Sequence, residues 1–151
     1  MLHHSRTSLY RLAFSITRNS SDAQEAVAEA VCRAYERYPQ LREKEKLPRW
    51  LLKITANEAR RLCQRRGRTV SLDDLPTEPA IPGRETGDDT LWQAVQTLPR
   101  DQREAVVLFY YEDLPTEEIA RIVGTSPGAV RVRLSRAREK LRSILKEGDY
   151  G

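Results

Sequence analysis

The sequence predicts an all-α protein with two small helical domains, residues 1–67 and 89–151, joined by a flexible acidic linker, residues 68–88. In both halves apolar residues recur every three or four positions, as on one face of an amphipathic helix. Residues 68–88 lose this period and hold three prolines and two glycines. The charge also changes sign: residues 1–67 carry 14 basic and 7 acidic side chains (net +7), whereas residues 68–90 carry 2 and 6 (net −4).

Composition narrows the class of protein. The 151 residues are 39% hydrophobic and 32% charged, with a net charge of +4, which suits packed cores under a polar surface. No apolar run is long enough for a membrane span, and no signal peptide opens the chain. Cys32 and Cys63 lack a CxxC partner, which disfavours a disulfide framework or a zinc site. We therefore expect a cytoplasmic protein without membrane insertion.

The first domain begins with a helix over about 5–17 and a second over 22–38. Ser21 and Gln24 form a candidate capping box, and Pro39 is a stop signal. One apolar stripe follows the second helix: Ala23, Ala26, Val27, Ala30, Val31, Ala34 and Tyr38. The charged residues opposite are either a solvated face or a contact surface.

A third helix is expected from Pro48, which suits a first helical turn, through 66. Steps of 100° per residue place its core face at Leu51, Leu52, Thr55, Ala59, Leu62 and Cys63. The opposite face carries Trp50, Lys53, Ile54, Asn57, Arg60, Arg61 and Gln64. An aromatic ring, an amide and several cations can stack an unpaired base, bond its edge and hold its phosphates. The alternative is that Trp50 packs against the core.

The acidic linker follows this helix. Its charge either keeps the segment soluble or lets it lie along a basic groove, and composition does not choose between these.

The second domain begins with a short amphipathic helix over 88–98, stopped by Pro99, and an apolar helix over 100–114. Residues 116–142 then read as helix, short turn, helix, the signature of a helix-turn-helix. Thr116 is the expected N-cap of the first of these helices. Gly124 supplies the turn, Ser126 is the next N-cap and Pro127 occupies the first helical position. The buried candidates in the first of these helices are Ile119, Ala120 and Val123.

The last helix is predicted to bind DNA. Its core stripe is Val130, Leu134, Ala137, Leu141 and Ile144. Its outward side is expected to carry Gly128, Ala129, Arg131, Val132, Ser135, Arg136 and Arg142. Arginines can bind phosphates or guanine edges in a major groove, and an outward valine can touch a thymine methyl. A merely basic, solvated helix is the alternative.

Three segments carry a family resemblance: "SSDAQEAVAEAVCRAYERY", "LPRWLLKITANEARRLCQRR" and "LPRDQREAVVLFYYEDLPTEEIARIVGTSPGAVRVRLSRAREKLR". In this order they resemble regions 2 and 4 of extracytoplasmic-function (ECF) sigma factors. The resemblance implies that region 2 binds the clamp of RNA polymerase core and melts the −10 element, while region 4 reads the −35 element. It implies RNA polymerase core and promoter DNA as partners, often with an anti-sigma factor, and no cofactor.

The resemblance also implies site residues. The polymerase-binding residues are Asp22, Glu25, Glu29 and Arg33. The −10 residues are Arg42, Lys44, Lys46, Trp50, Lys53, Asn57, Arg60 and Arg61. The −35 residues are Ser126, Arg131, Val132, Arg133, Ser135, Arg136 and Arg138.

Two departures from the family pattern stand out. Ala28 replaces the usual glutamine of the clamp-binding helix, and the first helix of region 2 is expected to be curtailed or absent.

Two other functions compete with this reading. A stand-alone helix-turn-helix regulator would share the last segment but would not need the Trp50, Asn57 and Arg60 face. An enzyme would need clustered carboxylates, histidines or a phosphate loop, whereas the only histidines are His3 and His4 and the pair Asp73 and Asp74 lies in the linker. We expect no catalytic activity.

Overall fold

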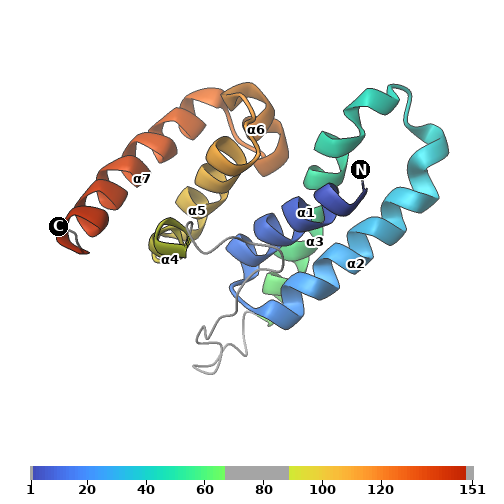
Figure 1. The fold of residues 1–151 in the computed structure, drawn as a ribbon. Helices are drawn as coiled ribbons and strands as arrows, with labels where there is room; N and C mark the ends of the chain where they lie inside the picture. Colours follow the sequence, from blue (N-terminus) through green and yellow to red (C-terminus); the bar gives the residue numbers. More distant parts are fainter. Residues whose placement is uncertain (1, 67–88, 149–151) are drawn as a thin grey trace. The chain divides into compact units, whose positions relative to one another are not determined.

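The computed structural model describes residues 2–66 and 89–148, and the chain divides into two compact units. Every regular element within these residues is helical, so the prediction of an all-α chain with two helical regions is confirmed. The first unit holds α1 to α3 and the second holds α4 to α7 (Figure 1). The predicted linker lies outside the described residues, and the exact domain bounds therefore stay a prediction.

The first unit is a bundle of three helices, α1 (Leu2–Thr17), α2 (Ser20–Arg37) and α3 (Leu47–Arg66). Each of them packs against the other two. Two short 3₁₀ turns, η1 (Tyr38–Gln40) and η2 (Lys44–Lys46), connect α2 to α3. The expectation that the first helix is curtailed or absent is wrong as to absence, because α1 has 16 residues and contributes buried side chains to the bundle.

Small residues on α2 let the three helices approach closely. Its buried apolar residues are all alanines, Ala23, Ala26, Ala30 and Ala34. Larger side chains from the other two helices, such as Leu12 and Leu52, supply the bulk of the core, each worth about 1.5–3 kcal/mol when buried. The predicted stripe was too wide, because Val31 is 39% exposed.

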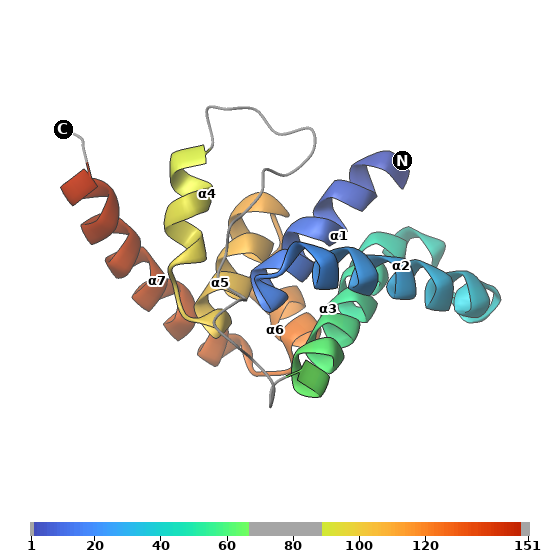
Figure 2. The ribbon, with the colours of Figure 1, turned by 90° about the horizontal axis from the view of Figure 1, so that it is seen from below.

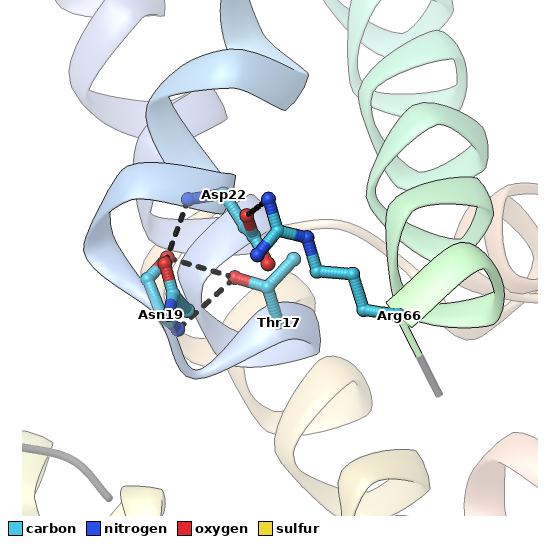
Figure 3. A network of polar contacts seen from close by, with 4 residues as sticks. All are labelled: Thr17, Asn19, Asp22 and Arg66. Atoms are coloured by element: carbon cyan, nitrogen blue, oxygen red, sulfur yellow. Dashed lines mark hydrogen bonds and ion pairs between the residues drawn. The ribbon is translucent and has the colours of Figure 1, made fainter. Parts of the chain in front are cut away.

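The start of α2 differs from the predicted capping box. Asn19, not Ser21, is the N-cap, and its Oδ1 accepts a hydrogen bond of 2.8 Å from the backbone N–H of Asp22. The Thr17 hydroxyl donates to the Asn19 carbonyl at 3.2 Å, and Asp22 is buried beside the N-cap (Figure 3). The Asp22 carboxylate forms an ion pair of 3.1 Å with Arg66 of α3. These contacts tie the end of α3 to the start of α2.

The second unit packs one long helix against three short ones. These are α4 (Asp89–Gln96), α5 (Arg100–Val106) and α6 (Thr116–Val123), and α7 (Pro127–Gly148) contacts all three (Figure 2). The core stripe predicted for α7 is buried from Val130 to Leu141, but Ile144 is 36% exposed.

The helix predicted over 100–114 is interrupted. After α5 the backbone widens into a π-helical turn, η6 (Val107–Tyr111). The backbone N–H of Glu112 donates to the Val107 carbonyl at 3.2 Å, five residues back, which is the π-helical pattern. The turn presents Phe109 and Tyr110 next to each other, with ring centroids 4.9 Å apart.

The helix-turn-helix between α6 and α7 follows the sequence prediction closely. Gly124 has φ 77° and ψ 43°, a left-handed conformation that glycine adopts without strain. The Ser126 hydroxyl accepts a hydrogen bond of 3.1 Å from the backbone N–H of Ala129, so Ser126 caps α7 as predicted. The predicted cap at Thr116 is wrong, because Pro115 holds the N-cap position of α6 and Thr116 is its first residue.

Candidate nucleic-acid interface

The first half of α7 presents a basic outer face. Arg131, Ser135 and Arg136 are exposed, and Val132 is 48% exposed. Successive arginines on this face lie five residues apart, or about 7.5 Å along the axis at 1.5 Å per residue. The two arginines make no hydrogen bond or ion pair with any described residue. A polyanion can therefore bind them without displacing a protein partner.

Two other predicted DNA contacts on α7 are held by the second unit itself. Arg133 forms an ion pair of 3.7 Å with Asp101 at the start of α5. The Arg138 Nε donates a hydrogen bond of 2.7 Å to the Tyr110 hydroxyl, and its guanidinium lies 5.7 Å from the Phe109 ring centroid. Both side chains are only partly exposed. The η6 turn and α5 therefore hold the flanking arginines in place.

Most residues of the predicted outer face of α3 are exposed to solvent, as the helical angles predicted. Lys53, Asn57 and Arg61 are exposed, while Trp50 and Arg60 are partly exposed. Ile54 is the exception, since only 7% of its surface is exposed. The angle of Ile54 lies at the border of the face, and an apolar side chain there packs inward. An aromatic ring, an amide and cations remain together on this face.

Two cations of the charged loop between α2 and α3, Lys44 and Lys46, make contacts with nearby residues of the chain. The Lys44 ammonium donates to the carbonyls of Tyr38 (2.9 Å) and Leu41 (2.7 Å) and lies 4.1 Å from the Tyr38 ring centroid. Lys46 forms an ion pair of 3.0 Å with Glu43. Arg42 is exposed. Lys44 therefore shapes the loop that leads into the Trp50 face.

The predicted polymerase-binding residues divide into two pairs. Glu25 and Glu29 are exposed on α2. Asp22 is only 6% exposed and is paired with Arg66. Arg33 points toward α3, where its Nε lies 2.6 Å from the Glu58 carboxylate. Of these four residues, only Glu25 and Glu29 are exposed rather than buried or half-buried on α2.

Sequence reasoning missed Glu58 and Tyr110. Glu58 is 5% exposed and contacts two predicted site residues, Arg33 and Arg61. One signal was present, because Glu58 is the only acidic residue in the predicted third helix, among several cations. Tyr110 gave no such signal, since its contact with Arg138 joins residues 28 positions apart.

Neither a metal cluster nor a membrane span occurs among the described residues. Within 2–66 and 89–148, no group of three His, Cys, Asp or Glu side chains could hold a metal ion. No helix in these ranges is long and apolar enough to cross a membrane.

The family comparisons cover both units. Residues 1–69 match the family described as "Sigma-70 region 2", and residues 88–141 match "Sigma-70, region 4". Regions 2 and 4 are thus both present in this chain, in the order that the sequence motifs predicted.

Relatives and solved structures agree with these matches. The chain is 32% identical to RNA polymerase sigma factor SigV of Bacillus subtilis (strain 168), over 93% of this chain and 86% of that protein. It is also 32% identical to ECF RNA polymerase sigma factor EcfG of Rhodopseudomonas palustris (strain TIE-1), over 91% and 79%. The fold matches sigma factor RpoE of Bartonella quintana, solved with the anti-sigma factor NepR, with a TM-score of 0.80, 27% identity and coverage of 98% and 96%. The chain belongs to the ECF group of the sigma-70 family of RNA polymerase sigma factors.

Proposed function

We propose that this chain binds RNA polymerase core and directs it to promoters, with the second unit reading the −35 element and the first melting the −10 element. The observation that carries the proposal is the pairing, in one chain, of a capped recognition helix with a separate unit that carries a ring, an amide and cations on one face. A stand-alone helix-turn-helix regulator would need only the first of these. The protein then acts in the cytoplasm, where the polymerase is, and needs no catalytic residue of its own.

In the second unit, α7 is the recognition helix in the major groove. Arg131 and Arg136 are the base- and phosphate-contacting cations, and Val132 and Ser135 lie between them on the same exposed face. Such arginines recognise guanine edges with two hydrogen bonds or hold phosphates through charge-assisted hydrogen bonds. Ser126 places the start of α7 at a phosphate. Arg133 and Arg138 flank this face as phosphate contacts.

In the first unit, the outer face of α3 binds the separated −10 strand. Trp50 stacks an unpaired base, and Asn57 bonds a base edge. The cations of this unit that hold the backbone of the strand are Arg42, Lys44, Lys46, Lys53, Arg60 and Arg61. The contacts of Lys44 with the carbonyls of its own loop supply a rigid entry to this face.

The exposed acids of α2 bind the polymerase. Changing Glu25 and Glu29 together to lysine is expected to weaken association with core polymerase at least tenfold, because both carboxylates face solvent and take no part in the core. The fold is expected to remain intact, which circular dichroism would check. Glu45→Lys, a charge reversal on an exposed residue of η2, serves as the control. Unchanged co-purification of the double variant with core polymerase would exclude this face.

The decisive test is run-off transcription with purified core polymerase on a library of promoters. We expect transcripts that start at defined sites and depend on added protein. A stand-alone regulator would instead bind an intact duplex and give no transcript with core polymerase alone. Permanganate reactivity of unpaired thymines reports strand opening in the same reactions.

A further inference from the structure

A buried carboxylate connects two residues to which the family resemblance gives separate tasks, Arg33 at the polymerase and Arg61 at the −10 element. Glu58 lies on α3, and only 7% of its side chain is exposed. One oxygen, Oε2, lies 2.6 Å from the Nε of Arg33 on α2. The other, Oε1, lies 3.6 Å from an Nη1 of Arg61, one turn further along α3. Arg33, Glu58 and Arg61 therefore form a charge triad that bridges two helices.

The two arginines of the triad differ in exposure and in geometry. The Arg33 side chain is 33% exposed and makes the shorter contact, whereas the Arg61 side chain is 52% exposed. A guanidinium has five N–H donors, and the 3.6 Å between Nη1 of Arg61 and Oε1 of Glu58 is too long for a hydrogen bond. Arg61 can thus bind a phosphate while its contact with Glu58 persists. Arg33 is the inner partner, and Arg61 is the outer one.

The charges of the triad decide how Arg61 attracts DNA. With both arginines present, the triad carries one net positive charge, and Arg61 is the more exposed of the two cations. If Arg33 were neutral, Glu58 would cancel the charge of Arg61, and it would do so strongly because the carboxylate is screened from water. Arg33 thus offsets Glu58 and leaves the charge of Arg61 available.

We propose that Arg33 is a positioning residue for promoter DNA, acting through Glu58 on Arg61, and that it is not a contact for the polymerase. The inference rests on the proposed function for the role of Arg61, and it reassigns the task that the family resemblance implied for Arg33. Glu25 and Glu29 keep the polymerase-binding role.

The test compares Arg33→Ala with Arg37→Ala in the full-length chain. Arg37 lies one turn further on α2, is exposed, and makes no hydrogen bond or ion pair with the described residues, so its loss removes the same charge without touching Glu58. The probe is a fluorescent single-stranded DNA oligonucleotide, with binding followed by anisotropy at two salt concentrations. We expect Arg33→Ala to bind about threefold to tenfold more weakly than Arg37→Ala. The logarithmic salt slope is expected to fall by about one unit, as for the loss of one phosphate contact.

A second change separates charge from folding. Removing Arg33 alone leaves Glu58 short of a partner and destabilises the first unit, so the variant Arg33→Ala with Glu58→Gln is made as well. It restores one net positive charge, and we expect it to recover DNA binding to within about twofold of the Arg37→Ala control. Failure of this rescue in a chain with a normal helical spectrum would overturn the proposal.

The affinity for core polymerase distinguishes a DNA-positioning role of Arg33 from a polymerase contact. We expect Arg33→Ala to bind core polymerase within about twofold of the unchanged chain, as a residue outside the interface does. A tenfold loss of core affinity, with DNA binding equal to that of Arg37→Ala, would make Arg33 a polymerase contact and overturn the proposal. If the unchanged chain failed to bind core polymerase at all, the proposed function would fail, while the comparison of the two variants on DNA would still decide the role of Arg33.

Discussion

The two helices that we propose to bind DNA, α7 and α3, differ in whether their arginines have ion-pair partners. On α7, Arg131 and Arg136 stand on an exposed face without a partner among the described residues. On α3, Arg61 shares Glu58 with Arg33, and Arg66 is paired with the buried Asp22. Arg131 and Arg136 thus offer open positive charge, whereas Arg61 and Arg66 of the first unit are paired with buried carboxylates.

This difference fits the two kinds of DNA that the units are proposed to bind. A duplex presents phosphates densely, so open cations on α7 gain most from it. A separated strand presents bases, and stacking on Trp50 supplies binding that does not depend on charge. We therefore expect most of the salt dependence of promoter binding to come from the second unit.

The largest effect is expected from the double variant Arg131→Ala with Arg136→Ala. Each bidentate contact with guanine is worth about 1–3 kcal/mol, so the pair is expected to cost about 2–6 kcal/mol of −35 binding. The measurement is transcription from a promoter library, at two salt concentrations. Arg142→Ala is the control, on an exposed residue of the same helix that lies about three turns beyond Arg131 and about 1.7 turns beyond Arg136.

The single variants refine this prediction. If either arginine reads a base, its loss relaxes the preference at one position. If it holds only phosphate, binding falls about equally for every sequence and the salt slope drops by about one unit. If both behave as phosphate contacts, specificity must come from Val132, from Ser135 or from DNA shape.

The next effect is expected from Trp50→Ala with Asn57→Ala. Stacking is worth about 1–3 kcal/mol per base, so open-complex formation should fall while −35 binding to duplex stays unchanged. Trp50 is partly exposed, so we expect a smaller loss of thermal stability than for a core tryptophan. Permanganate reactivity beside a melting curve separates the two effects. Loss of stability with normal strand opening would assign Trp50 to the core.

A third prediction concerns the cap of the recognition helix. Ser126→Ala removes the acceptor for the backbone N–H of Ala129 and is expected to cost about 1 kcal/mol of stability in the second unit. Thr116→Ala is the matched control, because Thr116 is not a cap. Its cost is expected to stay within about 0.5 kcal/mol. Equal losses in thermal denaturation would contradict the assignment of these caps.

The smallest effect is expected from Tyr110→Phe, which removes the hydroxyl that accepts from Arg138. The contact is exposed, so its loss should cost less than about 1 kcal/mol. Arg138→Ala, in contrast, should lower DNA binding for all sequences alike, because we propose that Arg138 contacts phosphate and not a base. A change of base preference in either variant would show that Arg138 takes part in reading the sequence.

Local signals explain what the sequence predicted well. Ser126, Pro127 and Gly124 act through backbone geometry within a few residues, and all three took the predicted positions. Neighbouring residues compete for caps, which explains the two errors: Asn19 displaced Ser21, and Pro115 left Thr116 inside the helix.

The remaining differences depend on contacts between distant residues. By helical angle Val31 lies at the edge of the predicted α2 stripe, and it is 39% exposed, whereas the four alanines nearer the centre of the bundle are buried. The ion pairs of Glu58 with Arg33 and of Asp22 with Arg66 join residues on different helices. Helical periodicity places residues on faces, but it does not say which charges meet across them.

The separation into two units has a spectroscopic consequence. The chain has two tryptophans, Trp50 in the first unit and Trp92 in the second. Trp92 is 5% exposed and makes a T-shaped contact with the Tyr111 ring, with ring centroids 5.5 Å apart. Its emission should therefore lie at shorter wavelength than that of Trp50, which is partly exposed to water. With Trp92 changed to phenylalanine, the emission of Trp50 reports the melting of the first unit. A base that stacks on Trp50 should quench the same emission. With Trp50 changed instead, the emission reports the recognition unit alone.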